Sequence, residues 1–304
     1  MEEPQIVEAV QMKKNVATLL HRIPCLLGEG PLWHATRKSI FWTDIEARAI
    51  HELTIPEGHY RHYEIGHRVG MIAEGVNAGL ILGMQGGFGR YDPDTDKLDW
   101  LADLEKDKPN NRANDGGCDA KGRFWIGTMD MDFKKGAGSL YRIGEDLLAE
   151  RLLDQVTISN GLAWSKDNGK AYYIDSPTRT VQSFLFDVEK GMLSPGSIAV
   201  RIPEYLGTPD GMCMDEEGML WIAHWGGFGV YRWNPIDGEL LELVMVPVPN
   251  VSSCAFGGEG FDKLFITTAR QGLTENELKM YPDSGSLYCV KLDIKGKAIY
   301  KCSL

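Results

Sequence analysis

The chain has 304 residues, of which 43% are hydrophobic and 10% aromatic, so it carries enough apolar material for a large packed core. Its formal net charge of −11 argues against a nucleic-acid surface and against binding to anionic membranes, because both require clustered Lys and Arg. The charge therefore favours a small neutral or cationic molecule as the partner.

No secretory signal is visible at the N-terminus, and we expect none. Residues 1–5 contain two acidic residues and no apolar stretch of the secretory type, and no later run reaches the length of a transmembrane helix. We therefore expect a cytoplasmic protein with no membrane partner. Its 6 cysteines lack the paired spacing of zinc sites, so reduced structural thiols are expected.

One pattern recurs along the chain: a polar residue, then a small residue, then an apolar run. Clear copies are Glu29-Gly30-Pro31-Leu32-Trp33, Asn114-Asp115-Gly116-Gly117-Cys118, Asn160-Gly161-Leu162-Ala163-Trp164 and Asp210-Gly211-Met212-Cys213-Met214, with weaker copies at Asn77-Ala78-Gly79-Leu80 and Ser253-Cys254-Ala255-Phe256. A period of roughly 40 to 50 residues that repeats about six times is typical of a β-propeller or a similar array. The repeat predicts a single domain over residues 1–304.

Each copy continues as a hairpin, with a polar turn and then a strand rich in aromatic and β-branched residues. These second strands are predicted at Ser39–Asp44, Gly79–Gly83, Arg123–Gly127, Ala171–Asp175, Met219–Ala223 and Lys263–Thr267. A third strand follows in most copies, for example in Gly86–Pro93 and Gly226–Pro235. The unit thus has about four short strands, which matches a propeller blade and an all-β fold. Only Thr274–Met280 has a helical pattern, and we expect it on a loop.

The polar residues of the repeat form a candidate site. The first strand of a propeller blade lies next to the central channel, so Glu29, Asn114, Asn160 and Asp210 are expected to converge at one end of it. Their carboxylate and amide oxygens suit a hard divalent cation such as Ca²⁺ or Mg²⁺. The alternative is that they are simply turn residues, since Asn and Asp before Gly favour turns. Asp210, in a tight Pro-Asp-Gly turn before an apolar strand, is the predicted catalytic residue.

Two further features carry less weight. The acidic residues Asp92, Asp94, Asp96 and Asp103 resemble part of a calcium-binding loop, but Lys97 stands where such a loop requires Gly, so we expect a hairpin turn. The 7 His are dispersed, and only His224, after the second strand of the Asp210 copy, is expected near the channel. We expect it to be a core or solvated residue that at most tunes the site.

Four motifs in order, Leu27–Trp33, Asn114–Gly116, Ile158–Leu162 and Pro209–Met212, make the chain similar to the senescence-marker-protein, regucalcin and gluconolactonase family, which includes luciferin-regenerating-enzyme-like members. The resemblance runs from about Ala17 to the end of the chain. It implies a six-bladed β-propeller with four-stranded antiparallel blades around a central channel. The extension at residues 1–16 has no clear equivalent in the family, and Ile6–Val10 predicts a strand that helps to close the ring.

The resemblance also implies roles for particular residues. Glu29, Asn160 and Asp210 match the family's ligands for one divalent metal, with Ca²⁺ preferred and Zn²⁺, Mg²⁺ or Mn²⁺ as alternatives. Arg112 and Asn114 match its substrate-binding residues. A sugar-contacting acidic residue of the family falls in a segment that is shorter here, so Asp130 and Asp132 are both candidates for its counterpart.

The implied function is the hydrolysis of sugar lactones, such as gluconolactone, to aldonic acids. The metal would polarise the carbonyl group and Asp210 would activate the attacking water. Two alternatives stay open: a calcium-binding regulatory protein without turnover, and a hydrolase of another ester or of a luciferin-related substrate. Because fold and metal do not determine the substrate, the preferred lactone and the oligomeric state are left open.

Overall fold

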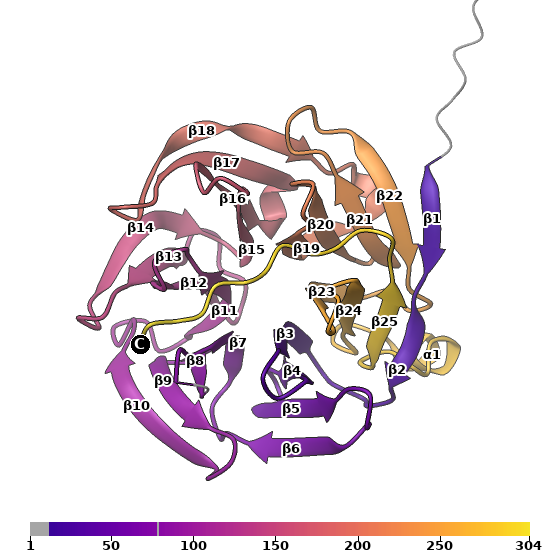
Figure 1. Ribbon diagram of the computed structural model, residues 1–304, viewed down its shortest axis with the longest axis horizontal. Coiled ribbons are helices and arrows are strands. Elements are labelled where there is room, and N and C mark those ends of the chain that lie inside the picture. Colours follow the sequence, from indigo (N-terminus) through magenta and orange to yellow (C-terminus); the bar gives the residue numbers. More distant parts are fainter. Residues whose placement is uncertain (1–11, 78) are drawn as a thin grey trace, which may run out of the picture.

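The computed structural model describes residues 12–77 and 79–304, which form six sheets arranged as blades around a central channel (Figure 1). Within each blade, consecutive strands pair in antiparallel register and run from the channel outward. The fold is therefore the six-bladed β-propeller that the sequence predicts. No helix in the described part of the chain is long and apolar enough to cross a membrane.

Within each blade the strands are ordered from the channel to the rim. The first three blades are β3 (Gly28–His34), β4 (Ser39–Asp44), β5 (Ala49–Thr54) and β6 (Tyr60–Glu64); β7 (Val69–Glu74), β8 (Leu80–Met84), β9 (Gly87–Asp92) and β10 (Lys97–Asp103); and β11 (Asn111–Cys118), β12 (Phe124–Asp130), β13 (Gly138–Ile143) and β14 (Ala149–Val156). The next three are β15 (Ser159–Trp164), β16 (Lys170–Asp175), β17 (Thr180–Asp187) and β18 (Met192–Arg201); β19 (Thr208–Met214), β20 (Leu220–Trp225), β21 (Gly229–Trp233) and β22 (Leu240–Met245); and β23 (Val251–Gly257), β24 (Lys263–Thr268) and β25 (Leu287–Lys291) with β2 (Thr18–His21).

Two N-terminal strands join the last two blades. β2 pairs with β25, so the outermost strand of the sixth blade comes from the start of the chain and closes the ring. β1 (Lys13–Val16) adds a parallel strand to β22 at the rim of the fifth blade. The strand predicted at Ile6–Val10 lies outside the described residues.

The helical segments are short and lie in connecting loops. They are the 3₁₀ turns η1 (Ser176–Thr178) and η2 (Glu204–Leu206) and the helix α1 (Glu275–Met280). Thr274 caps α1: its side chain accepts a hydrogen bond from the Glu277 backbone N–H, and the Glu277 side chain accepts one from the Thr274 backbone N–H. The prediction of a helical turn at Thr274–Met280 is confirmed.

The second strands carry most of the core, because each is covered on both faces by the neighbouring blades. Every residue of β4 and β12 is buried. Trp42, Trp125 and Trp221 lie on the second strands β4, β12 and β20 and are at most 1% exposed. This double coverage explains why the second strands are nearly continuous apolar runs in the sequence.

In two blades, a buried aspartate at the equivalent position stabilises the inner hairpin. Asp119 accepts hydrogen bonds from the Trp125 indole N–H at 2.9 Å and from the Arg123 Nε at 2.7 Å. Asp215 accepts from Trp221 at 2.9 Å and from the Arg232 Nε at 2.7 Å. Both carboxylates are fully buried, so each holds the turn and the second strand together without competition from water.

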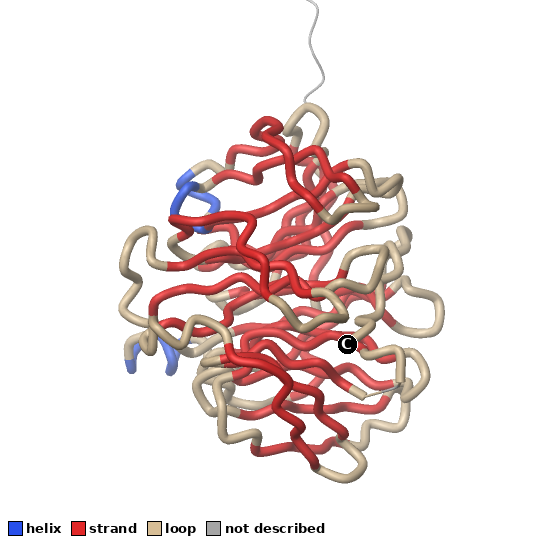
Figure 2. Tube along the Cα trace, turned by 90° about the vertical axis from the view of Figure 1, so that its left-hand side faces the viewer, coloured by secondary structure: helices blue, strands red, loops and turns tan. Residues whose placement is uncertain are grey.

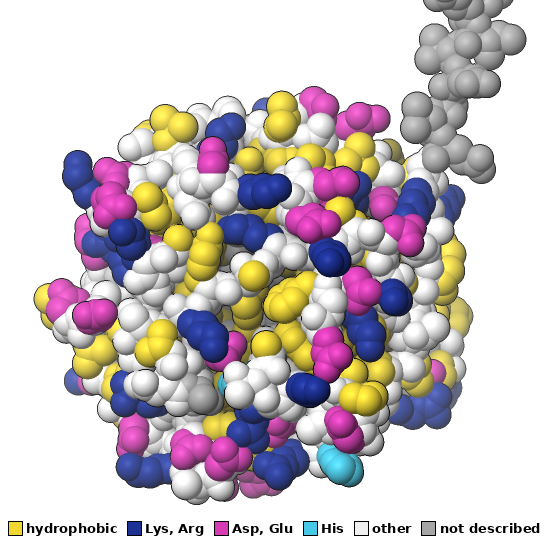
Figure 3. Space-filling model, viewed as in Figure 1, with side chains coloured by type: hydrophobic (Ala, Val, Ile, Leu, Met, Phe, Trp, Pro, Cys, Tyr) yellow, Lys and Arg dark blue, Asp and Glu magenta, His cyan; other side chains and the backbone are white. Residues whose placement is uncertain are grey.

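The C-terminal segment crosses one face of the ring (Figure 1), and the helical segments lie on the opposite side of the molecule (Figure 2). Its backbone bonds to three blades: Lys297 N–H to the Met214 carbonyl, Cys302 N–H to Glu74 and Ser303 N–H to Gly122. Hydrophobic side chains gather near the centre of this face (Figure 3). The segment therefore covers one end of the channel, a feature that the repeat pattern does not predict.

The buried carboxylates predict a large effect on stability. Asp119→Ala leaves the Trp125 N–H and the Arg123 guanidinium without their acceptor, so unfolding should become easier by about 3 kcal/mol, as for one partner lost from a buried ion pair. Urea unfolding followed by tryptophan fluorescence measures this. Lys121→Ala in the same turn is the control and should unfold like the parent; equal curves for both variants would contradict the role of Asp119.

Candidate functional site

The C-terminal segment lines a cavity of about 150 Å³ at its end of the channel. A second cavity, of about 390 Å³, lies at the other end of the channel and is the candidate site. Its size is within the range of small-molecule sites. It is lined by Leu27, Glu29, Arg112, Asn114, Met129, Phe133, Ile158, Asn160, Ser176, Thr208, Pro209, Asp210, Trp225, Gln271 and Gly272. Five residues that the sequence singles out, Glu29, Arg112, Asn114, Asn160 and Asp210, thus meet in one cavity.

A β-bulge in each innermost strand aims these side chains at the channel. The pairing with the second strand shifts between Glu29 and Leu32, between Asn160 and Leu162, and between Pro209 and Met212. Bulges of this kind re-aim side chains next to functional sites. The prediction that Asp210 belongs to a turn before the strand is wrong, because β19 already begins at Thr208.

The glycine after each polar residue lets neighbouring blades approach closely. A Cβ atom on Gly161 would lie 2.9 Å from the Asp210 carbonyl oxygen, and one on Gly211 would lie 2.2 Å from the Ser253 Oγ. Both contacts are too short for any other residue without a backbone shift. The small residue of the repeat is therefore a requirement of packing around the channel.

A chain of hydrogen bonds connects the third, fourth and fifth blades across the cavity floor. Arg112 Nη1 donates to the Asn114 Oδ1, and Asn114 Nδ2 donates to the Asn160 Oδ1 at 3.1 Å. Asn160 Nδ2 donates to the Ser176 Oγ at 2.8 Å, which donates to the Pro209 carbonyl at 2.7 Å. These bonds orient both amide groups, so that the Asn160 Oδ1 faces Asn114 rather than Ser176.

Three carboxyl groups share the interior of the channel. Burial raises the pKa of Glu29 and of Asp210 well above their ordinary values, and repulsion from neighbouring carboxylates raises them further. Burial also raises the pKa of Asp115, next to Asn114, to about 6. Arg112 is the cation that interacts with Glu29 and Asp210, and burial lowers its pKa to about 10, so it remains charged at neutral pH.

This donor set fits a hard divalent cation. Glu29 and Asp210 are 5% and 7% exposed, so water does little to offset their mutual repulsion. With the Asn160 Oδ1 they offer oxygen ligands of the kind that Ca²⁺ and Mg²⁺ prefer. A cation bound between them would remove the repulsion and keep both groups ionised.

Asp130 and Asp132 lie outside this cavity. Asp130 lines a neighbouring cavity with Asn111 and Lys134. Its Oδ1 accepts the Asp132 backbone N–H at 2.9 Å, and the Asp132 Oδ2 accepts from the Asn110 side chain at 3.0 Å. The two carboxylates therefore shape the loop after β12 and do not touch the cavity floor.

The cavity also contains residues that sequence reasoning missed. Met129, Phe133, Trp225 and Gln271 line its walls. They lie at strand ends and on connecting loops outside the repeated motif, so only the three-dimensional arrangement identifies them. His224, by contrast, does not line the cavity: it is fully buried, its Nδ1 bonds to the Leu206 carbonyl at 2.8 Å, and its ring stacks on Tyr231.

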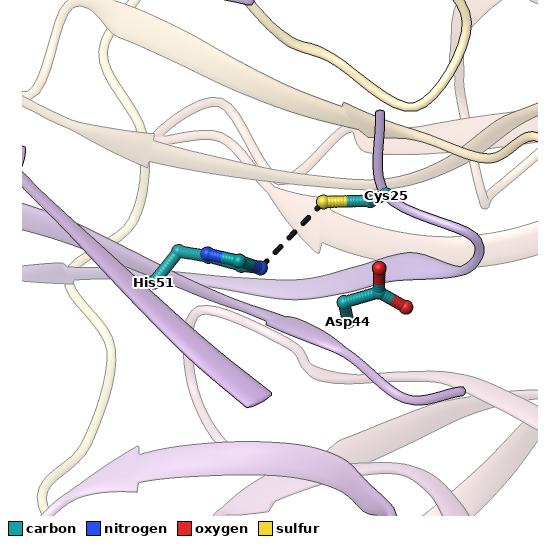
Figure 4. A group of neighbouring side chains, drawn as sticks. All are labelled: Cys25, Asp44 and His51. Atoms are coloured by element: carbon teal, nitrogen blue, oxygen red, sulfur yellow. Dashed lines mark hydrogen bonds between the residues drawn. The ribbon is translucent and has the colours of Figure 1, made fainter. Parts of the chain in front are cut away.

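Cys25, Asp44 and His51 form another group, with one ligand atom from each within 4.8 Å of the others (Figure 4). The Cys25 Sγ lies 3.7 Å from the His51 Nε2, but the Asp44 carboxylate points away from the His51 ring. Asp44 accepts the backbone N–H groups of Leu26 and Leu27 at 2.8 and 3.1 Å. Its role is therefore to hold the segment that leads to Glu29.

Asp175 holds the equivalent segment in the fourth blade. It accepts the backbone N–H groups of Thr157 and Ile158 at 3.1 and 2.9 Å, just before Asn160. Asp44 and Asp175 are both the last residues of a second strand. Two of the predicted metal ligands are thus positioned by equivalent carboxylates, a repeat that the sequence analysis did not identify.

Comparisons with known proteins agree with this architecture. The family model described as the SMP-30/gluconolactonase/LRE-like region matches residues 27–270. A putative sugar lactone lactonase, YvrE of Bacillus subtilis, is 34% identical, with 89% of this chain and 93% of that protein covered. Regucalcin of Xenopus laevis is 32% identical, with 90% and 93% covered. The crystal structure of a calcium-binding protein, regucalcin of Agrobacterium tumefaciens, has a TM-score of 0.88 and 26% identity, with 96% and 99% covered.

The site predicts how calcium binding responds to mutation. Calorimetric titration of chelator-treated protein should show a single Ca²⁺ site per chain. Glu29→Gln should weaken the affinity for Ca²⁺ by about tenfold or more. Loss of a residue that only hydrogen-bonds to a metal ligand usually costs that much, and loss of a ligand should cost at least as much. Asp92→Asn is the control: Asp92 accepts the Asp94 backbone N–H in a hairpin turn, and binding should stay at the parent level. Parent-like affinity in Glu29→Gln would remove Glu29 from the ligand set.

Proposed function

The chain belongs to the SMP-30/gluconolactonase/LRE-like family, and we propose that it hydrolyses sugar lactones to aldonic acids with one bound divalent cation. The observation that carries the proposal is the meeting of Glu29, Asn160, Asp210 and Arg112 in one cavity. The name of the Bacillus relative, a putative sugar lactone lactonase, supports the lactone substrate. The names of the regucalcin relatives support Ca²⁺, with Zn²⁺, Mg²⁺ and Mn²⁺ as alternatives.

Glu29, Asn160 and Asp210 would hold the cation through side-chain oxygens. When bound, it would polarise the lactone carbonyl and stabilise the negative charge that develops on its oxygen. The Asn114–Asn160 hydrogen bond keeps the amide oxygen on the channel side. The segments that carry Glu29 and Asn160 are fixed by Asp44 and Asp175, so the ligand oxygens are held in place before the substrate arrives.

Asp210 is the proposed general base. It accepts a proton from the water that attacks the carbonyl carbon, and it gives this proton to the ring oxygen as the ring C–O bond breaks, so that a hydroxy acid is released. Arg112 and Asn114 hold substrate oxygens beside it. The hydrogen bonds that Arg112 donates to the Ala113 carbonyl and to Asn114 both use Nη1, so the rest of the guanidinium is available to a ligand. Asp130 and Asp132 are proposed to meet sugar hydroxyls only at the rim.

A calcium-binding protein without turnover is the second candidate, because two relatives carry the names regucalcin and calcium-binding protein. An ion-binding site needs carboxylate and amide oxygens but no cation beside them. Arg112, buried in the same cavity, would weaken calcium binding, so its presence fits a site in which an anionic or polarised substrate oxygen also binds. It therefore favours the enzyme.

The roles of the two carboxylates can be separated. Both help to bind the cation, so saturating metal should restore occupancy in Glu29→Gln and in Asp210→Asn. Glu29→Gln should then recover much of its rate, whereas Asp210→Asn should stay slower by about 100-fold or more, the usual contribution of a general base. Turnover is measured against metal concentration, with bound metal quantified in parallel. Full recovery of Asp210→Asn would remove its assignment as the base.

A further inference from the structure

The cavity is polar at its floor and apolar on its walls. Its charged and amide groups lie together on the innermost strands, at Glu29, Arg112, Asn114, Asn160 and Asp210. The walls are formed by Leu27, Met129, Phe133, Ile158, Pro209 and Trp225. A ligand that fits this cavity therefore has a polar end and an apolar remainder.

Phe133 is the clearest apolar wall residue. It lies on the loop after β12, and its side chain is 55% exposed although it lines the cavity. Its backbone has a φ of 59°, a left-handed conformation that aromatic residues rarely adopt, and its N–H bonds to the Asp130 carbonyl at 2.9 Å. The loop thus holds a large apolar ring half in water at the mouth of the cavity, which gains stability only when a ligand covers it.

Other exposed apolar side chains lie beside the wall residues. Leu26, next to Leu27, is 50% exposed. Phe228, three residues after Trp225, is 39% exposed and its ring contacts Tyr281. These two side chains add exposed apolar surface at positions close to the wall residues along the chain.

The walls contain few groups that can bind hydroxyls. Ser176 already donates to the Pro209 carbonyl and accepts from Asn160. Thr208 and Gln271 are the remaining polar residues among those that line the cavity outside the floor. Hydroxyls on the outer half of a ligand would therefore lose hydrogen bonds to water and find few replacements in the walls, whereas hydroxyls near the floor face Arg112, Asn114 and Asn160.

We propose that the preferred substrate is a lactone whose ring keeps the hydroxyls of a sugar lactone and that also carries an apolar arm, an alkyl or aryl substituent. The polar lactone ring lies at the floor among Arg112, Asn160 and Asp210, and the arm lies along Phe133, Met129 and Trp225. The inference rests on the proposed lactonase function and specifies its substrate class. It makes Phe133 a specificity-determining residue.

The test uses five-membered lactones with straight alkyl arms of increasing length, together with gluconolactone. The value of kcat/KM should rise about fourfold for each methylene that becomes buried, up to the length at which the arm leaves the cavity. The matching lactams, which resist hydrolysis, are titrated by calorimetry in parallel. Their affinity should rise with arm length by a similar factor.

Phe133→Asn tests the wall, since Asn tolerates the left-handed conformation and removes the apolar ring. The ratio of kcat/KM between the longest and the shortest arm should fall by about tenfold or more, because a buried aromatic side chain accounts for several methylenes of apolar contact. Leu148→Asn is the control. Leu148 is 71% exposed on the loop between β13 and β14, does not line the cavity, and its replacement should leave the ratio at the parent value.

The outcomes separate the two proposals. Turnover of lactones without dependence on arm length, or a parent-like ratio in Phe133→Asn, would overturn the apolar-arm inference and leave the lactonase proposal intact. No turnover of any lactone, with lactam affinity that still rises with arm length and falls in Phe133→Asn, would overturn the lactonase proposal and support the apolar-arm site.

Discussion

The repulsion between Glu29 and Asp210, buried together at one end of the channel, is the interaction on which the site depends. Both carboxylates are almost fully buried, so water screens them little; Asp115 adds to the repulsion, and Arg112 offsets only part of it. The innermost strands nevertheless force them together, because Gly161 and Gly211 allow the blades to approach to backbone contact. Such an arrangement costs free energy in the protein alone, and a bound divalent cation would offset that cost.

The surrounding framework does not rely on that cation. The ring is closed by pairing between β2 and β25, the C-terminal segment is fastened to three blades, and Asp119 and Asp215 anchor inner hairpins. Asp44 and Asp175 hold the segments that lead into the site. Backbone hydrogen bonds and packing thus hold the buried carboxylates together despite their repulsion. The side-chain oxygens are therefore in place before metal or substrate binds.

Sequence reasoning reached the fold and the floor of the site because both follow from a local pattern that repeats. A polar residue before a small one marks an innermost strand in each clear copy, and the propeller geometry brings Glu29, Asn160 and Asp210 to one end of the channel. The assignment of Asp210 to a turn was wrong because a bulge inside a strand has the same Asp-Gly signature as a turn. The apolar walls could not be predicted, since Phe133 reaches the cavity from the loop after β12 and Trp225 from the end of β20, and their meeting depends on tertiary contacts. The path of the C-terminal segment across the ring could not be predicted for the same reason.

The central claim is that Glu29, Asn160 and Asp210 hold a divalent cation that the hydrolysis of lactones requires. The most direct test is proton release from gluconolactone by chelator-treated protein, with Ca²⁺, Zn²⁺, Mg²⁺ or Mn²⁺ added back singly and the circular dichroism spectrum recorded at each step. The account predicts that turnover disappears on chelation and returns with metal, while the spectrum stays unchanged. Full turnover by metal-free protein, or loss of the folded spectrum on chelation, would contradict it.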